Sequence, residues 1–82
     1  MTNKKPQRVQ TGVRIEKRIL KVLKAVAAQQ EMSLGDLLEG ILLHSFEGKA
    51  SFDTETLGFI EQMRTAYGLD LSANDSAWID PS

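Results

Sequence analysis

The basic side chains of this 82-residue chain, which could bind an anionic partner, gather at its beginning. Residues 1–24 carry eight lysines and arginines and one acid, Glu16, which gives a local net charge of +7. Residues 25–82 carry two basic residues and ten acids, a net charge of −8. The overall charge of −1 hides this asymmetry. A basic segment of this density indicates a polyanionic partner, and a solvated basic face without a partner is the alternative.

The residue types that most enzymes need are scarce. The chain has no cysteine and one histidine, His44, which argues against disulfides, thiolate metal sites and a zinc site built by one chain. It also has no glycine-rich phosphate loop and no convergent set of acids. We therefore expect no enzyme, no cofactor and no metal, and we expect His44 to lie in a core or an interface.

The length of the chain limits it to one small domain, which a single core stabilises only modestly. Without disulfides or a metal, oligomerisation is the remaining way to gain stability, so we expect a homodimer. No stretch approaches the roughly 20 apolar residues of a membrane span, and Met1 to Gln10 contain no apolar signal region. The sequence therefore predicts a cytoplasmic protein with no membrane partner.

Residues 8–15 alternate with a period of two, which predicts a β-strand. One parity is polar or lacks a side chain, and the other is apolar or β-branched. The first comprises Arg8, Gln10, Gly12 and Arg14, and the second Val9, Thr11, Val13 and Ile15. A lone strand cannot satisfy its backbone groups. No other segment has the pattern of a strand, so we expect pairing with the same segment of a second chain.

Two helical patterns follow the strand. The first runs from Glu16 to about Gln30 and separates an apolar side from a basic side. The basic side carries Lys17, Arg18, Lys21 and Lys24. The second runs from about Leu34 to Glu47 after a Ser33-x-x-Asp36 capping signature. Its apolar residues cover much of its circumference, which indicates burial at the centre of a dimer.

A third helix is expected between a cap at Asp53 or Thr54 and Tyr67, with Gly68 ending it. We expect its apolar face to pack on the dimer core or on another dimer. Little fixed structure is expected from Ser72 onward.

The order strand, helix, short turn, helix resembles the ribbon-helix-helix (MetJ/Arc/CopG) family of DNA-binding proteins. The residues that carry the resemblance lie within residues 8–47: Gln10-Thr11-Gly12-Val13-Arg14-Ile15, Ile19-Leu20, Leu23, Val26-Ala27, Ser33-Leu34-Gly35-Asp36-Leu37-Leu38 and Ile41-Leu42. Two glycines, Gly12 and Gly35, depart from the polar residues that the family often has there.

The resemblance implies a mainly α fold with one short strand per chain, an intertwined ribbon-helix-helix homodimer with an additional C-terminal helix. Four segments are then expected. They are a flexible basic N-terminal segment (1–7), a dimerisation and DNA-binding domain (8–47), a linker with the third helix (48–71) and a flexible acidic tail (72–82).

In this family two strands pair antiparallel and enter the major groove. The resemblance implies base contacts from Gln10, Gly12 and Arg14, where arginine suits guanine and glutamine suits adenine. It also implies phosphate contacts at the start of the second helix, from Ser33, Leu34 and Gly35. Further phosphate contacts are expected from Lys4, Lys5, Arg8, Lys17 and Arg18. The expected dimer core comprises Val9, Thr11, Val13, Ile15, Leu23, Leu37, Leu38, Ile41 and Leu42.

The leading hypothesis is a sequence-specific double-stranded DNA-binding transcriptional regulator, a repressor, which acts as a homodimer through this ribbon. The first alternative is the antitoxin of a toxin–antitoxin pair, in which the acidic stretch from Ser51 to Trp78 binds a toxin. The second alternative is a dimerisation or interaction module without DNA binding, which Gly12 and the acidic overall balance would favour.

Overall fold

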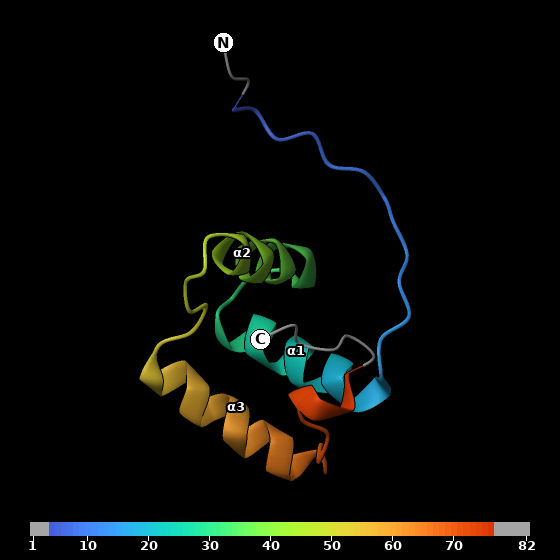
Figure 1. The fold of residues 1–82 in the computed structure, drawn as a ribbon, viewed down its shortest axis with the longest axis vertical. Coiled ribbons are helices and arrows are strands. Elements are labelled where there is room, and N and C mark those ends of the chain that lie inside the picture. Colours follow the sequence, from blue (N-terminus) through green and yellow to red (C-terminus); the bar gives the residue numbers. More distant parts are fainter. Residues whose placement is uncertain (1–3, 77–82) are drawn as a thin grey trace.

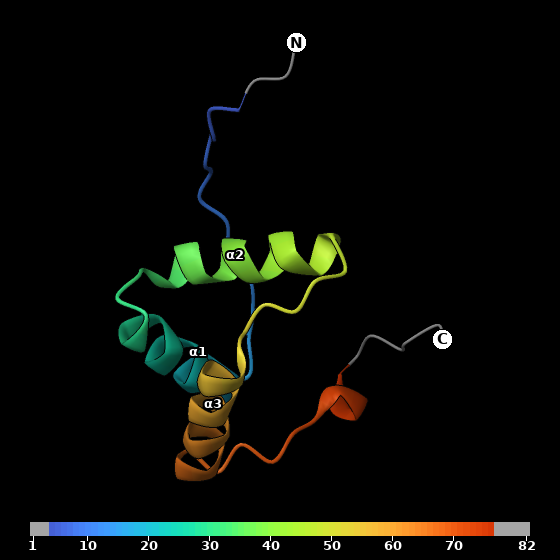
Figure 2. The ribbon, with the colours of Figure 1, turned by 90° about the vertical axis from the view of Figure 1, so that its left-hand side faces the viewer.

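The computed structural model describes residues 4–76, in which an extended N-terminal segment precedes three α-helices (Figure 1). The helices are α1 (Lys17–Gln29), α2 (Leu34–Phe46) and α3 (Thr54–Ala66), and a short 3-10 helix, η1, spans Ala73–Asp75. α1 packs against both α2 and α3. Figure 2 shows α2 running crosswise to α3, with α1 between them.

Each α-helix begins after a residue whose side chain accepts a backbone N–H from the first turn, which replaces a bond that the helix itself cannot supply. The acceptor and donor residues are Glu16 and Arg18 for α1, Ser33 and Asp36 for α2, and Asp53 and Thr56 for α3. These contacts confirm the predicted caps at Ser33 and Asp53. They also place Glu16 at the cap position of α1 rather than inside the helix.

The end of α3 confirms the predicted stop at Gly68. This residue has a φ of +66°, in the left-handed region that favours glycine. The N–H of Leu69 then donates to the carbonyl oxygen of Arg64 at 2.8 Å, which closes the last turn. The chain therefore reverses and returns along α1.

The core is small and centres on α1. Val22, Val26 and Ala27 of α1 are buried together with Leu37 of α2, and Val26 is 1% exposed. Half-buried apolar side chains of α3 and of the segments beside it pack around this centre: Phe52, Phe59, Ile60, Met63 and Leu69. One apolar face of α1 therefore packs against both α2 and α3.

The strand predicted at residues 8–15 is wrong, and with it the ribbon-helix-helix fold class. Within residues 4–76 the secondary structure is helical, with no strand and no sheet. Residues 4–15 are extended (Figure 1), but no described segment runs alongside them to form a ladder. The alternation marks side chains that share a face, whereas a strand also needs backbone partners, and a single chain supplies none here.

The segment after α3 also differs from the expectation. Ser72 and Asp75 form a reciprocal capping box around η1, in which the N–H of Ser72 donates to Oδ2 of Asp75 at 2.8 Å. Residues 72–76 are therefore ordered into a turn. Trp78 lies outside the described residues.

Replacing Gly68 by alanine is expected to lower the free energy of unfolding by about 1 kcal/mol, because the new Cβ is strained at a positive φ. The matched control is Gly58→Ala in the middle of α3, where the added Cβ meets no atom within 4 Å. This change is expected to raise the same free energy by about 0.5–1 kcal/mol. Urea unfolding followed by circular dichroism measures both, and shifts of the same sign would contradict the geometry at Gly68.

Candidate nucleic-acid interface

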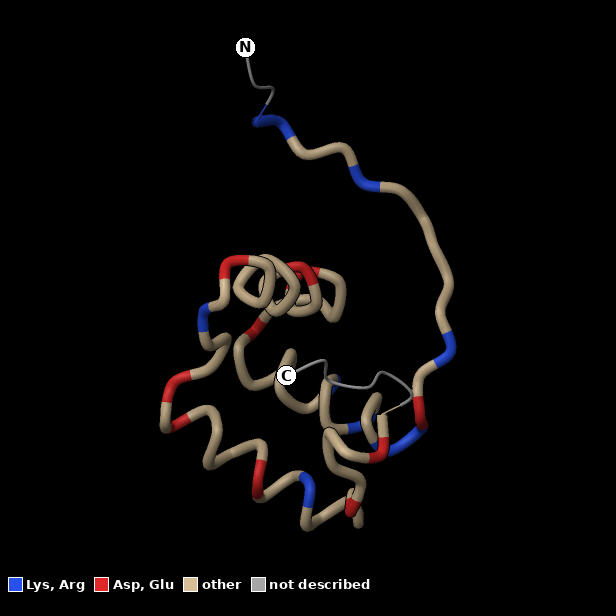
Figure 3. Tube along the Cα trace, viewed as in Figure 1, with Lys and Arg blue, Asp and Glu red and all other residues tan. Residues whose placement is uncertain are grey.

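Most of the basic residues occupy one part of the molecule, and Lys49 and Arg64 lie outside it. Figure 3 shows lysines and arginines along the extended segment and on α1, whereas acidic residues predominate on α2, on α3 and in the segments that follow them. The side chains of the extended segment, residues 4–15, are exposed. We name residues 4–15 the basic arm.

The predicted base-contacting residues lie along this arm. Gln10 and Arg14 are exposed, and neither side chain has a hydrogen-bond or ion-pair partner among residues 4–76. Gly12 lies between them in open space, since an added Cβ would meet no atom within 4 Å. The structure thus presents the three residues to solvent on one extended stretch of backbone.

Arg8 ties the arm to α2. Its Nε and Nη2 donate to the two carboxylate oxygens of Glu39 at 2.8 and 3.0 Å, a forked geometry that suits guanidinium and carboxylate. The hydrogen bond with Glu39 raises the pKa of Arg8, and that with Arg8 lowers the pKa of Glu39. Both side chains remain exposed, so the pair contributes little to stability. A phosphate could therefore replace Glu39 at small cost.

Arg18, which was predicted to contact phosphate, is already engaged inside the chain. Its Nε donates to Glu16 at 2.7 Å, and its Nη1 donates to Asp70 and to the carbonyl oxygen of Gly68, both at 3.0 Å. The Arg18 side chain is only 37% exposed. It therefore joins the start of α1 to the segment after α3. The hydrogen bonds from the Arg18 side chain and backbone lower the pKa of Glu16.

The other predicted phosphate contacts are divided between two places. Lys4, Lys5 and Lys17 are exposed on the arm and at the first residue of α1. The hydroxyl of Ser33 accepts from Asp36 at 3.1 Å, at the start of α2. Since Arg8 meets α2 at Glu39, more than one helical turn further on, the arm approaches the middle of α2. The charge of Asp36 also raises the pKa of Arg8, after the larger effect of Glu39, so the arm lies within electrostatic range of the first turn of α2, which begins with Leu34 and Gly35.

The predicted dimer core is only partly covered within one chain. Leu37 is buried in the core described above, and Leu23, Leu38 and Ile41 are half-buried. The exposed members are Val9, Thr11, Val13, Ile15 and Leu42. Two more large apolar residues of α2, Leu43 and Phe46, are exposed as well, and Phe46 is 78% exposed. The sequence already indicated a role for Leu43 and Phe46, because both belong to the apolar residues that cover much of the circumference of this helix.

His44 does not lie in the core of the single chain, and its expected position in an interface stays a prediction. Its side chain is exposed, and its Nδ1 donates to the carbonyl oxygen of Gly40 at 2.6 Å on the same helix. Among residues 4–76 no three potential ligands of the His, Cys, Asp or Glu type gather into a metal-binding group. None of the helices described is long and apolar enough to cross a membrane.

Comparison with known proteins adds no family to this picture. No model of a protein family matches the sequence, and no match is found among the curated proteins or the solved structures. The resemblance described above therefore stays a prediction from the residues that carry it.

The acid sensitivity of the fold provides a test of the Glu16–Arg18 contact. Because the pKa of Glu16 is lowered in the folded chain, its contribution to stability is present above its ordinary pKa and is lost as the pH falls through the lowered value. Glu16→Gln is expected to reduce the loss of unfolding free energy between about pH 5 and about pH 3. Chemical unfolding at a series of pH values measures this loss.

The control is Glu55→Gln, which changes an exposed carboxylate that has no ion pair among residues 4–76. The control is expected to keep the pH dependence of the unchanged protein. The assignment is contradicted if Glu16→Gln and Glu55→Gln give the same slope.

Proposed function

We propose that this chain is a site-specific double-stranded DNA-binding protein that regulates transcription as a homodimer. The observation that carries the proposal is the separation of charge in space: the exposed basic arm and α1 hold the positive charge, and the rest of the described chain is mainly acidic (Figure 3). Contacts between basic side chains and phosphates supply most of the sequence-independent affinity for DNA. The net charge of the whole chain is therefore a poor guide to its partner.

The basic arm supplies the proposed contacts without a strand. An extended segment is narrow enough to lie in a groove of DNA, and Gly12 keeps its centre slim. Arg14 would donate to O6 and N7 of guanine, and Gln10 would pair with N6 and N7 of adenine. Lys4, Lys5 and Lys17 would contact phosphates, and Arg8 would exchange Glu39 for a phosphate.

The exposed apolar residues of α2 support a homodimer. Among the helices of residues 4–76, α2 packs only against α1, and Leu42, Leu43 and Phe46 are exposed to water. Full burial of one such side chain contributes about 1.5–3 kcal/mol, a large amount for a chain whose buried core is so small. A second copy would cover this face with the same face of its own α2. Two copies also present two basic arms, which suits a symmetric DNA site.

The C-terminal half favours the regulator over the antitoxin. α3 packs on α1, and Arg18 and Arg64 hold the segment that follows it through Gly68, Asp70 and Leu71. Residues 54–76 are therefore engaged with their own domain rather than held apart for a separate partner.

The homodimer is tested at a pair of leucines with equal exposure. Leu42 on α2 is 50% exposed and Leu57 on α3 is 52% exposed. Leu42→Lys is expected to turn the dimer into a monomer, because it puts a charge on the proposed dimer face. Leu57→Lys is expected to leave the dimer intact. Sedimentation equilibrium measures the mass of each variant, and a dimer that survives Leu42→Lys would exclude this face as the contact.

DNA binding is tested by selecting sites from a random pool and then measuring affinity for the selected site at several salt concentrations. A palindromic site and a steep salt dependence are expected, because each phosphate contact releases counterions. Arg14→Ala is expected to weaken specific binding about tenfold and to relax one position in each half-site.

The matched control is Lys49→Ala, which removes an exposed basic residue beyond α2 that pairs with Glu47. It is expected to leave affinity and specificity unchanged. If no DNA sequence is enriched from the pool, the interaction module without DNA binding is favoured. If Arg14→Ala and Lys49→Ala lose the same affinity for the selected site, the proposed role of Arg14 is refuted.

A further inference from the structure

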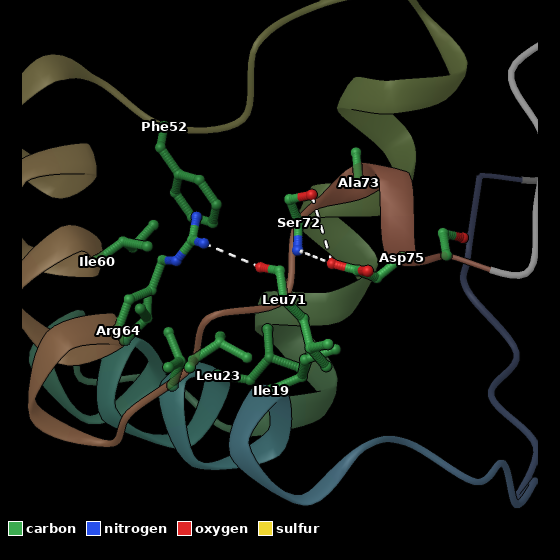
Figure 4. A pocket seen from close by; sticks show the side chains of 13 residues that line it. Ile19, Leu23, Phe52, Ile60, Arg64, Leu71, Ser72, Ala73 and Asp75 are labelled. Carbon is green, nitrogen blue, oxygen red and sulfur yellow. Dashed lines mark hydrogen bonds between the residues drawn. The ribbon is translucent and has the colours of Figure 1, made fainter.

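A cavity of about 490 Å³ lies between α1, α3 and the segment that follows α3 (Figure 4). Its wall is mainly apolar and includes Ile19 and Leu23 of α1, Ile60 of α3, Phe52 before α3 and Leu71 after it. Sites for small molecules have this size and this predominantly apolar lining, with a few polar groups that orient the ligand. None of the residues proposed to contact DNA lines the cavity.

Arg64 brings a positive charge to this wall. Figure 4 shows its guanidinium between the ring of Phe52 and the carbonyl oxygen of Leu71, to which Nη2 donates at 2.9 Å. Its Nε is buried without an acceptor. Within residues 4–76 no carboxylate pairs with this guanidinium. A cation in apolar surroundings is unfavourable until a counter-charge accompanies it.

The carboxylate of Asp75 also lines the cavity, and it already accepts hydrogen bonds from Ser72. Asp75 turns its Oδ2 toward Ser72, whose N–H donates at 2.8 Å and whose hydroxyl lies at 3.5 Å (Figure 4). These bonds hold the capping box of η1 together. Two charged side chains line the cavity, Asp75 and Arg64, and neither forms an ion pair among residues 4–76. Asp75 is held by the hydrogen bonds of the capping box, whereas Nε of Arg64 has no acceptor, so Arg64 is the group that can take an anionic ligand.

We propose that the cavity binds a small amphipathic carboxylate. The ligand's carboxylate pairs with the Nη groups of Arg64, because guanidinium and carboxylate form strong charge-assisted hydrogen bonds. Its hydrocarbon part lies against Ile19, Leu23 and Ile60. This binding site is separate from the proposed DNA contact and does not depend on it.

Calorimetric titration of decanoate into the full chain tests the site in the absence of DNA. One saturable site per chain is expected, and decyltrimethylammonium, which has a similar chain and the opposite charge, is expected not to bind. Arg64→Met is expected to weaken decanoate binding about tenfold. Lys49→Met removes a positive charge outside the cavity and is the matched control, with unchanged binding expected.

A second variant keeps the test sound if Arg64→Met fails to fold, which circular dichroism would reveal. Ala73 lines the cavity from an exposed position on η1, so Ala73→Trp fills the space and leaves Arg64 in place. It is expected to prevent decanoate binding without loss of helix. Full binding by a folded Arg64→Met or Ala73→Trp variant would overturn the proposal.

Three further results would also overturn it. One is equal binding of decanoate and decyltrimethylammonium, because the charge of Arg64 would then have no role. Another is decanoate binding only by a chain that ends at Ser76, which would assign the cavity to the chain's own C-terminal residues. The third is binding only at dilutions where the chain is monomeric, which would assign it to a second copy.

Discussion

The packing of α1 is the constraint on which the rest of the structure depends. α2 and α3 both pack against α1, and three of the four buried apolar residues, Val22, Val26 and Ala27, belong to it. Because these residues recur at helical spacing, they hold one face of α1 in the core and leave Lys21 and Lys24 outside. The position of the basic surface is thus a consequence of the apolar pattern of the same helix.

Contacts between distant residues then join the basic and the acidic parts of the chain. Arg8 and Arg18 pair with Glu39 and Asp70, and both partners come from the acidic part. In each case the cation is an arginine, whose planar group can bond to several acceptors at once. These exposed pairs are weak in water, whereas DNA offers a row of phosphates. The Arg8–Glu39 pair can therefore place the arm beside α2 without blocking the proposed binding.

The helices could be predicted because their signals are local. Ser33 and Asp53 cap their helices with atoms from the following turn, and Gly68 ends α3 through its own backbone conformation. The pairs of Arg8 with Glu39 and Arg18 with Asp70 have no such signal, since they join residues 31 and 52 positions apart.

The predicted strand failed for a related reason. Alternation over residues 8–15 describes which side chains share a face, but the backbone partner that makes a strand has no counterpart within residues 4–76. Of the candidate site, the sequence placed Gln10, Gly12 and Arg14 together on one stretch, because neighbours in the sequence stay close in an extended chain. It did not reveal that Arg18 is held by the segment after α3.

The two proposed contact surfaces are physically independent, because they lie on different helices that pack on α1. The apolar face with Leu42, Leu43 and Phe46 belongs to α2, and no residue of α2 lines the cavity beside Arg64. A second copy that covers α2 would therefore leave that cavity's lining unchanged. Conversely, the cavity wall needs α1, α3 and the segment held by Arg64, all of which one chain provides. The proposed ligand would therefore meet the same cavity wall in a monomer and in a dimer.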